Sequence, residues 1–211
     1  MGLVVNVVVS CFVACAGPIG CTRLNTIECM ATLTIKLPSQ AGQTRFNLRR
    51  WDALQTDPAL AKIEGRIETD RHGQIIMTPP LAPSHGSYQF WIGHLLEKLM
   101  PGGRILTECP ISTANGVRAA DIAWASSEKM RELGNRSCFP KAPELCVEVL
   151  SPGNTKAEME EKTALYFDAG ALEVWWCDMN GSMKFLARDV PAPLNKSKLC
   201  PKFPKRVRLP Y

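Results

Sequence analysis

A glutamate stands inside the run of residues that reads most clearly as a buried β-strand. The run is Leu145-Cys146-Val147-Glu148-Val149-Leu150, and Ser151-Pro152-Gly153-Asn154 ends it. Because side chains alternate along a strand, Glu148 shares its face with Cys146 and Leu150. An ionised carboxylate is costly to bury unless it is paired or binds a metal. Glu148 is therefore predicted to belong to a metal site or a buried ion pair, or else to mark the one wet position of an edge strand.

A second carboxylate of this kind is Asp121, within the strand-like run Val117–Ala125. Its face of the strand carries only small residues, namely Ala119, Ala123 and Ala125. Small neighbours leave room for an ion or for an oxygen of a substrate. A turn-capping aspartate is the alternative, but Ile122-Ala123-Trp124 continues the strand beyond Asp121.

A lysine completes the set. In the helix predicted over 155–169, Lys162 falls on the same face as Met159, Thr163 and Tyr166, which is the apolar face. Glu148 lies about 13 Å back along its strand from the turn near residue 152 at ~3.3 Å per residue. Lys162 lies about 10–12 Å along the helix at ~1.5 Å per residue. If the helix packs back on the sheet, the two side chains meet; the alternative is a lysine that merely covers apolar surface.

Two carboxylates and a lysine suit the hydrolysis of a phosphodiester. A divalent cation held by Asp121 and Glu148 would bind a phosphate oxygen and lower the pKa of its water. Oxygen ligands favour Mg²⁺ or Mn²⁺, and the carbonyl of Val149 is a further candidate ligand. Lys162 would orient the water or stabilise the charge of the transition state.

The remaining pattern predicts an α/β (α+β) fold with a mixed central β-sheet and few helices. Residues 38–48 are predicted to be loop or partial strand. Ser84 is predicted to cap a long helix, which Pro101-Gly102-Gly103 stops. The other expected elements are a short helix over 48–55, a hairpin of 60–68 and 74–78, strands over 104–107, 109–113, 172–178 and 183–187, and a helical turn near 128–133.

Length and composition favour one domain, since the chain has 211 residues, of which 45% are hydrophobic. Residues 1–29 are interpreted as an upstream extension before a start at Met30, residues 30–190 as the domain, and residues 191–211 as a basic, proline-rich and solvated tail. The apolar run 2–16 is too short for a membrane span, and no basic residue precedes it as in a secretory signal.

Charge and cysteine usage agree with a cytoplasmic protein that has no membrane partner. The net charge of +5 permits nucleic-acid binding without requiring it. The nine cysteines form no Cys-x-x-Cys pair and suit a reducing compartment, so we assign them no chemistry.

The segment Pro143–Pro152, followed by Glu161-Lys162, Leu165-Tyr166, Ala169-Gly170, Glu173, Trp175 and Asp178, resembles the Uma-two family of restriction-endonuclease-like proteins. That family belongs to the PD-(D/E)XK nuclease superfamily. Ile63-Glu64-Gly65, Thr78-Pro79-Pro80 and Ser84-His85 add to the likeness, which covers roughly 45–190. The resemblance implies a restriction-endonuclease-like sheet flanked by helices. It also implies that Asp121 is the first acid and Glu148 the second acid of the superfamily's active-site motif. The lysine of that motif usually follows on the strand, at the position that Leu150 occupies here; the resemblance implies that Lys162 on the helix takes its place.

The chain departs from the family pattern at several positions. Ala120 replaces the usual proline, and Ala61 and Arg66 fall near positions that often carry glutamates. If one of those acids assists metal binding, Glu64 or Glu68 must take over here, or none does. The further accessory candidates are Glu108 and Tyr166.

The sequence thus predicts a Mg²⁺- or Mn²⁺-dependent endonuclease that acts on nucleic acid, with DNA expected from the family. A homodimer is expected because cutting two strands needs two sites, with Val174–Trp176 as interface or as core. One rival is an inactive nuclease fold that binds DNA or a protein, and another is an assembly protein whose acid–lysine trio is structural. His85 is interpreted as a surface histidine beside a capping serine. Asn154 and Thr155 are interpreted as helix caps rather than phosphate contacts.

Overall fold

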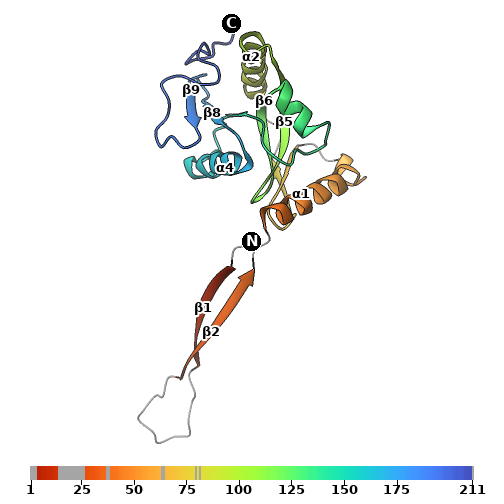
Figure 1. Ribbon diagram of the computed structural model, residues 1–211, viewed down its shortest axis with the longest axis vertical. Coiled ribbons are helices and arrows are strands. Elements are labelled where there is room, and N and C mark those ends of the chain that lie inside the picture. Colours follow the sequence, from red (N-terminus) through yellow and green to blue (C-terminus); the bar gives the residue numbers. More distant parts are fainter. Residues whose placement is uncertain are drawn as a thin grey trace, which may run out of the picture. The chain divides into compact units, whose positions relative to one another are not determined.

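The computed structural model describes residues 4–13, 27–36, 39–62, 65–78, 80 and 82–210, and divides the chain into the units Met1–Gly42 and Gln43–Tyr211 (Figure 1). In the first unit, β1 (Val4–Val13) pairs antiparallel with β2 (Ile27–Lys36), so that Val4 lies opposite Lys36. The proposed start at Met30 falls within β2 and stays a prediction.

The second unit is built on a five-stranded sheet of order β5-β6-β7-β8-β9 (Figure 1). Its strands are β5 (Gly103–Thr113), β6 (Gly116–Ser126), β7 (Leu145–Val149), β8 (Glu173–Cys177) and β9 (Met183–Ala187). Only β7 and β8 are parallel, because α4 (Lys156–Ala169) carries the chain back between them. The sheet is mixed and flanked by helices, which confirms the predicted fold class.

The sheet buries apolar side chains on both faces. One core lies between α4 and the sheet and includes Met159, Tyr166, Cys146 and Trp176. The other lies between α2 (Pro83–Leu99) and the sheet and includes Ile92, Leu96, Val147 and Trp175. Val174, Trp175 and Trp176 are all buried, so the idea that they form an exposed dimer interface is wrong.

The second unit also contains a small hairpin, a 3₁₀ turn and a short helix. β3 (Arg66–Thr69) pairs with β4 (Ile75–Thr78), as predicted, while residues 60–62 form a 3₁₀ turn, η1, rather than a strand. The short helix α3 (Ser127–Leu133) follows β6, as expected.

Two helices begin at residues other than those predicted. α1 (Gln40–Gln55) includes most of the region expected to be loop, because Asn47 is buried and bonds Ser112 Oγ at 2.9 Å and the Gly116 carbonyl at 3.2 Å. α2 begins after Ala82, with Pro83 in its first turn, so Ser84 is not its cap. Within the described residues, no helix is both long and apolar enough to cross a membrane.

The C-terminal segment 191–210 packs onto the domain. Cys200, Phe203 and Val207 are buried in the core beneath α2. Glu173, which is 1% exposed, accepts hydrogen bonds from Ser197 Oγ at 2.7 Å and from the Lys198 backbone N–H at 2.6 Å. The expectation of a solvated tail is therefore corrected: the carboxylate of Glu173 holds this segment in place.

Candidate active site

Asp121 and Glu148 lie where the pairing of two central strands ends. β6 and β7 pair over Ile122–Trp124 and Leu145–Val147, so Asp121 and Glu148 are next in register. Beyond this point a side chain replaces a backbone acceptor: Asp121 Oδ2 accepts a hydrogen bond of 2.6 Å from the Val149 backbone N–H. Both acids are buried, with residue exposures of 1% for Asp121 and 5% for Glu148.

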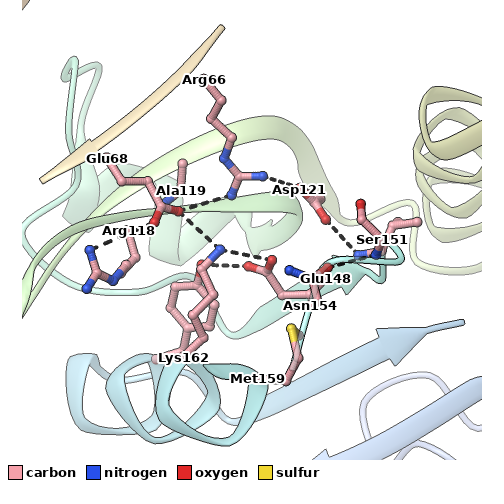
Figure 2. A network of polar contacts seen from close by, with 12 residues as sticks. Arg66, Glu68, Arg118, Ala119, Asp121, Glu148, Ser151, Asn154, Met159 and Lys162 are labelled. Atoms are coloured by element: carbon pink, nitrogen blue, oxygen red, sulfur yellow. Dashed lines mark hydrogen bonds and ion pairs between the residues drawn. The ribbon is translucent and has the colours of Figure 1, made fainter. Parts of the chain in front are cut away.

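Lys162 reaches Glu148 from α4, as the length argument predicted (Figure 2). Its Nζ lies 3.1 Å from Glu148 Oε2 and 3.1 Å from Glu68 Oε1. The hydroxyl of Tyr166, one turn further along the helix, donates to Glu148 Oε1 at 2.7 Å. Lys162 therefore joins two acids rather than covering apolar surface, and Tyr166 fixes the second oxygen of Glu148.

The start of α4 is fixed by local sequence. Thr155 Oγ1 accepts from the Glu158 backbone N–H at 3.2 Å, and Glu158 Oε2 accepts from the Thr155 N–H at 2.8 Å, which forms a capping box. Asn154 Oδ1 accepts from the Ser151 N–H at 2.7 Å. The expectation of a helix cap is confirmed for Thr155, whereas Asn154 bonds the turn before the helix and does not cap it. The capped start sets the height at which Lys162 meets the sheet.

The β3–β4 hairpin brings two charged residues to the site: Glu68, which the sequence offered as a possible accessory acid, and Arg66, to which it gave no role there. Arg66 forms an ion pair through Nη1 with Asp121 Oδ1, and its Nη2 lies 3.3 Å from Glu68 Oε1. Glu68 also accepts from the Ala119 backbone N–H at 3.0 Å. Alternation along the strand was the available signal, because Arg66 and Glu68 share one face of β3.

His85 corrects another expectation. It is 6% exposed rather than on the surface, and its Nε2 lies 3.0 Å from the Val149 carbonyl oxygen and 3.2 Å from Asp121 Oδ2. Both of these atoms are acceptors, so Nε2 carries the proton. Helical spacing contained the signal, because His85 lies 7 and 11 positions before the buried Ile92 and Leu96.

Of the acids predicted to assist the site, the structure places Glu108 but not Glu64. Glu108 lies where the β5–β6 pairing is interrupted, between the pairs Thr107↔Ile122 and Cys109↔Ala120. Its Oε2 is 3.3 Å from Arg66 Nε, at ion-pair distance, although the two make no hydrogen bond. Its φ of 47° is in the left-handed region, an unusual backbone state for a non-glycine residue within a strand. Glu64 lies outside the described residues.

The environment drives the pKa values of the two central acids apart. Burial would raise the pKa of Asp121, but the hydrogen bond from His85 and the charge of Arg66 outweigh it and lower this pKa. Burial, together with the charge of Asp121, raises the pKa of Glu148 despite the partial offset from Lys162. Asp121 is therefore the carboxylate that stays ionised, and Glu148 the one that holds a proton more readily.

These side chains line a cavity of about 660 Å³. Arg66, Asp121, Glu148 and Lys162 contribute to its wall, as do Arg118 and Asn154. Burial alone would lower the pKa of Lys162, but the charges of Glu148 and Glu68 raise it, so the lysine is a cation at neutral pH. The cavity therefore presents both acids and cations to whatever it binds.

Most of the second unit matches a known family. Residues 52–192 match the sequence model of Uma2, described as "Putative restriction endonuclease", and this range is more than half of the chain. The chain belongs to the Uma2 family. The resemblance seen in the sequence is thereby confirmed, and it supports a nuclease-like role.

A solved structure shows the same fold. The crystal structure of "a putative nuclease belonging to DUF820" from Anabaena variabilis is 18% identical, with a TM-score of 0.55, and the match covers 66% of this chain and 80% of that one. At this level of identity the likeness concerns the fold alone. None of the curated proteins compared with the chain matches it.

In this Uma2 chain the donor set fits a hard divalent cation in chemistry. Asp121, Glu148 and the Val149 carbonyl offer oxygen atoms, which suit Mg²⁺ or Mn²⁺. Among the residues the structure describes, no three His, Cys, Asp or Glu side chains are arranged as a metal cluster. Two protein cations, Arg66 and Lys162, lie among the acids instead.

Proposed function

We propose that this Uma2 protein is a divalent-metal-dependent endonuclease that hydrolyses phosphodiester bonds of DNA. The observation that carries the proposal is the group of Asp121, Glu148 and Lys162 on the wall of one cavity, at the point where β6 and β7 stop pairing. Buried acids and a buried lysine beside a cavity are typical of catalytic sites. Assignment to the PD-(D/E)XK superfamily is part of the proposal.

Asp121, Glu148 and the Val149 carbonyl would hold the Mg²⁺ or Mn²⁺ ion. A divalent cation supplies charge neutralisation at the phosphate and a more acidic water. His85 and the Val149 N–H hold Asp121 Oδ2, and Tyr166 holds Glu148 Oε1, so each carboxylate keeps a defined orientation. Such outer contacts orient metal ligands and tune them.

Lys162 would orient the attacking water and stabilise charge on the phosphate in the transition state. An ammonium group has three N–H donors, and the contacts with Glu148 and Glu68 use two of them. The third donor can serve a water or a phosphate oxygen.

DNA as substrate rests on the family, and the net charge of +5 is compatible with it. We further propose a homodimer, because cutting both strands needs two sites, and a cytoplasmic protein, because Cys109, Cys138, Cys146, Cys177 and Cys200 are buried free thiols.

The test combines Mn²⁺ and Mg²⁺ calorimetry with a plasmid-nicking assay on the wild type and Glu148→Ala. We expect binding and nicking in the wild type and the loss of both in the folded variant. Glu160→Ala, an exposed acid on α4, is the matched control and should retain both. Nicking by Glu148→Ala at the wild-type rate would overturn the proposal.

A second candidate is an inactive nuclease fold that binds DNA or a protein partner. The ion pair of Arg66 with Asp121 favours it, because a protein cation already satisfies the acid. Metal binding without nicking of any DNA substrate would support this candidate. If the acids and the lysine are only structural, Glu148→Gln should change the stability of the fold and leave the metal affinity unchanged.

A further inference from the structure

Arg66 holds the oxygen of Asp121 that a metal would need. Asp121 Oδ2 is already occupied by the Val149 N–H at 2.6 Å and by His85 Nε2 at 3.2 Å. Oδ1 is therefore the oxygen that faces the remaining ligands, and Arg66 Nη1 donates to it (Figure 2). A guanidinium and a divalent cation cannot share that position, because two cations in contact repel strongly in a buried site.

The setting makes Arg66 a strongly held cation. Its side chain is 14% exposed. Burial acts to lower the pKa of Arg66, but the charges of Glu148, Asp121, Glu68 and Glu108 outweigh that effect and raise it. Since the guanidinium cannot lose its proton, it can leave Asp121 only by moving.

The contacts allow such a movement without leaving the charge unpaired. Arg66 Nη2 lies 3.3 Å from Glu68 Oε1, and Nε lies 3.3 Å from Glu108 Oε2. Nε is one of the few buried side-chain nitrogens in the described part of the chain that have no hydrogen-bond partner. When the contact with Asp121 breaks, the guanidinium can turn toward Glu108 and gain this missing bond.

From these contacts we propose that Arg66 is the resident counter-cation of Asp121 and competes with metal for Oδ1. In the absence of metal it neutralises the acid, and it thereby sets the metal affinity of the site. The inference rests on the proposed metal-dependent function. It adds that the metal affinity is held down by a residue of the protein itself.

The test is calorimetry of the full chain with Mn²⁺ alone, in the absence of nucleic acid. Arg66→Met keeps the length of the side chain and removes the competing charge. We expect it to bind Mn²⁺ at least about tenfold more tightly than the wild type, or to bind when the wild type does not. Its thermal unfolding without metal should occur at a lower temperature, and Mn²⁺ should raise that temperature by more than in the wild type.

Arg118→Met separates competition from a general change in charge. Arg118 lies near Glu68, with Nη1 3.8 Å from Oε2, and the structure gives it no ion pair with Asp121. Its removal should change Mn²⁺ affinity much less than Arg66→Met. If Arg66→Met does not fold, Arg66→Lys serves instead, because a lysine lacks the fork that spans three acids, and it should bind Mn²⁺ more tightly than the wild type.

The outcomes are distinct. Unchanged or weaker Mn²⁺ binding in folded Arg66→Met or Arg66→Lys overturns the inference, and so does an equal gain in Arg118→Met. If the wild type nicks DNA while Arg66→Met gains no affinity, the inference fails and the proposed function stands. If Arg66→Met binds Mn²⁺ more tightly while no variant nicks DNA, the inference stands and the proposed enzymatic function fails.

Discussion

Asp121 on β6 is joined to Val149 on β7 by a hydrogen bond of 2.6 Å, from the backbone N–H to Oδ2, at the place where the two strands cease to pair. The side chain thus replaces a backbone partner and keeps the end of β7 ordered. It also brings the Val149 carbonyl, Glu148 and Asp121 together at one end of the strand pair. The candidate site therefore forms where the pairing of β6 with β7 ends.

Replacing Lys162 by methionine should separate chemistry from metal binding. The apolar stem remains packed, while the ammonium that contacts Glu148 and Glu68 at 3.1 Å is lost. We expect the rate of plasmid nicking to fall by about 10²–10³, by analogy with other losses of transition-state charge stabilisation. Mn²⁺ affinity measured by calorimetry should not fall, because the variant removes a cation and no proposed metal ligand. Lys156→Met, an exposed lysine on the same helix, should nick like the wild type; equal rates in the two variants would exclude a catalytic role for Lys162.

His85 should act as a positioning residue for the proposed metal ligands Asp121 and Val149. His85→Ala removes the contacts of 3.0 Å to the Val149 carbonyl and 3.2 Å to Asp121 Oδ2. Loss of such an outer partner typically weakens metal affinity by about 10–100-fold. His85→Gln should recover part of the affinity, because its amide also donates a hydrogen bond. His94→Ala, an exposed histidine stacked on Phe90, should leave Mn²⁺ binding unchanged. Were His85 only a packing residue, its removal would change thermal stability and not the Mn²⁺ dissociation constant.

The sequence was sufficient for the parts of the site that follow from periodicity. Alternation along one strand identified Glu148, helical spacing identified Lys162, and rise per residue predicted that they meet. The sequence did not reveal that Arg66 would reach Asp121, because that contact depends on how the β3–β4 hairpin docks beside β6. Long-range docking of a short hairpin leaves no periodic pattern in the chain.

Acid should remove the stability that Asp121 contributes. The pKa of Asp121 is lowered below its ordinary value of 3.8, so its contribution is fully present above that value and is lost as the pH falls through the lower folded pKa. Asp121→Asn breaks the buried pair with Arg66, which should reduce the free energy of unfolding by about 3–5 kcal/mol at neutral pH. The difference between wild type and variant should shrink on acidification.

Urea unfolding at a series of pH values measures the difference in free energy of unfolding between the wild type and Asp121→Asn. Glu148 works in the opposite direction because its pKa is raised, so only the comparison of wild type with Asp121→Asn isolates Asp121. A difference that stays constant from neutral pH to well below 3.8 would contradict the lowered pKa of Asp121.

The C-terminal segment should be essential to the stability of the domain. Phe203 is 4% exposed and packs with Trp175 at a ring-centroid distance of 4.7 Å, beneath α2. Phe203→Ala should lower the free energy of unfolding by about 3–5 kcal/mol, because it leaves a cavity in this core. The neighbouring Lys202 is exposed, and Lys202→Ala should change stability by less than about 0.5 kcal/mol. Equal stability of the two variants in urea unfolding would mean that residues 191–210 do behave as the solvated tail that the basic, proline-rich sequence predicts.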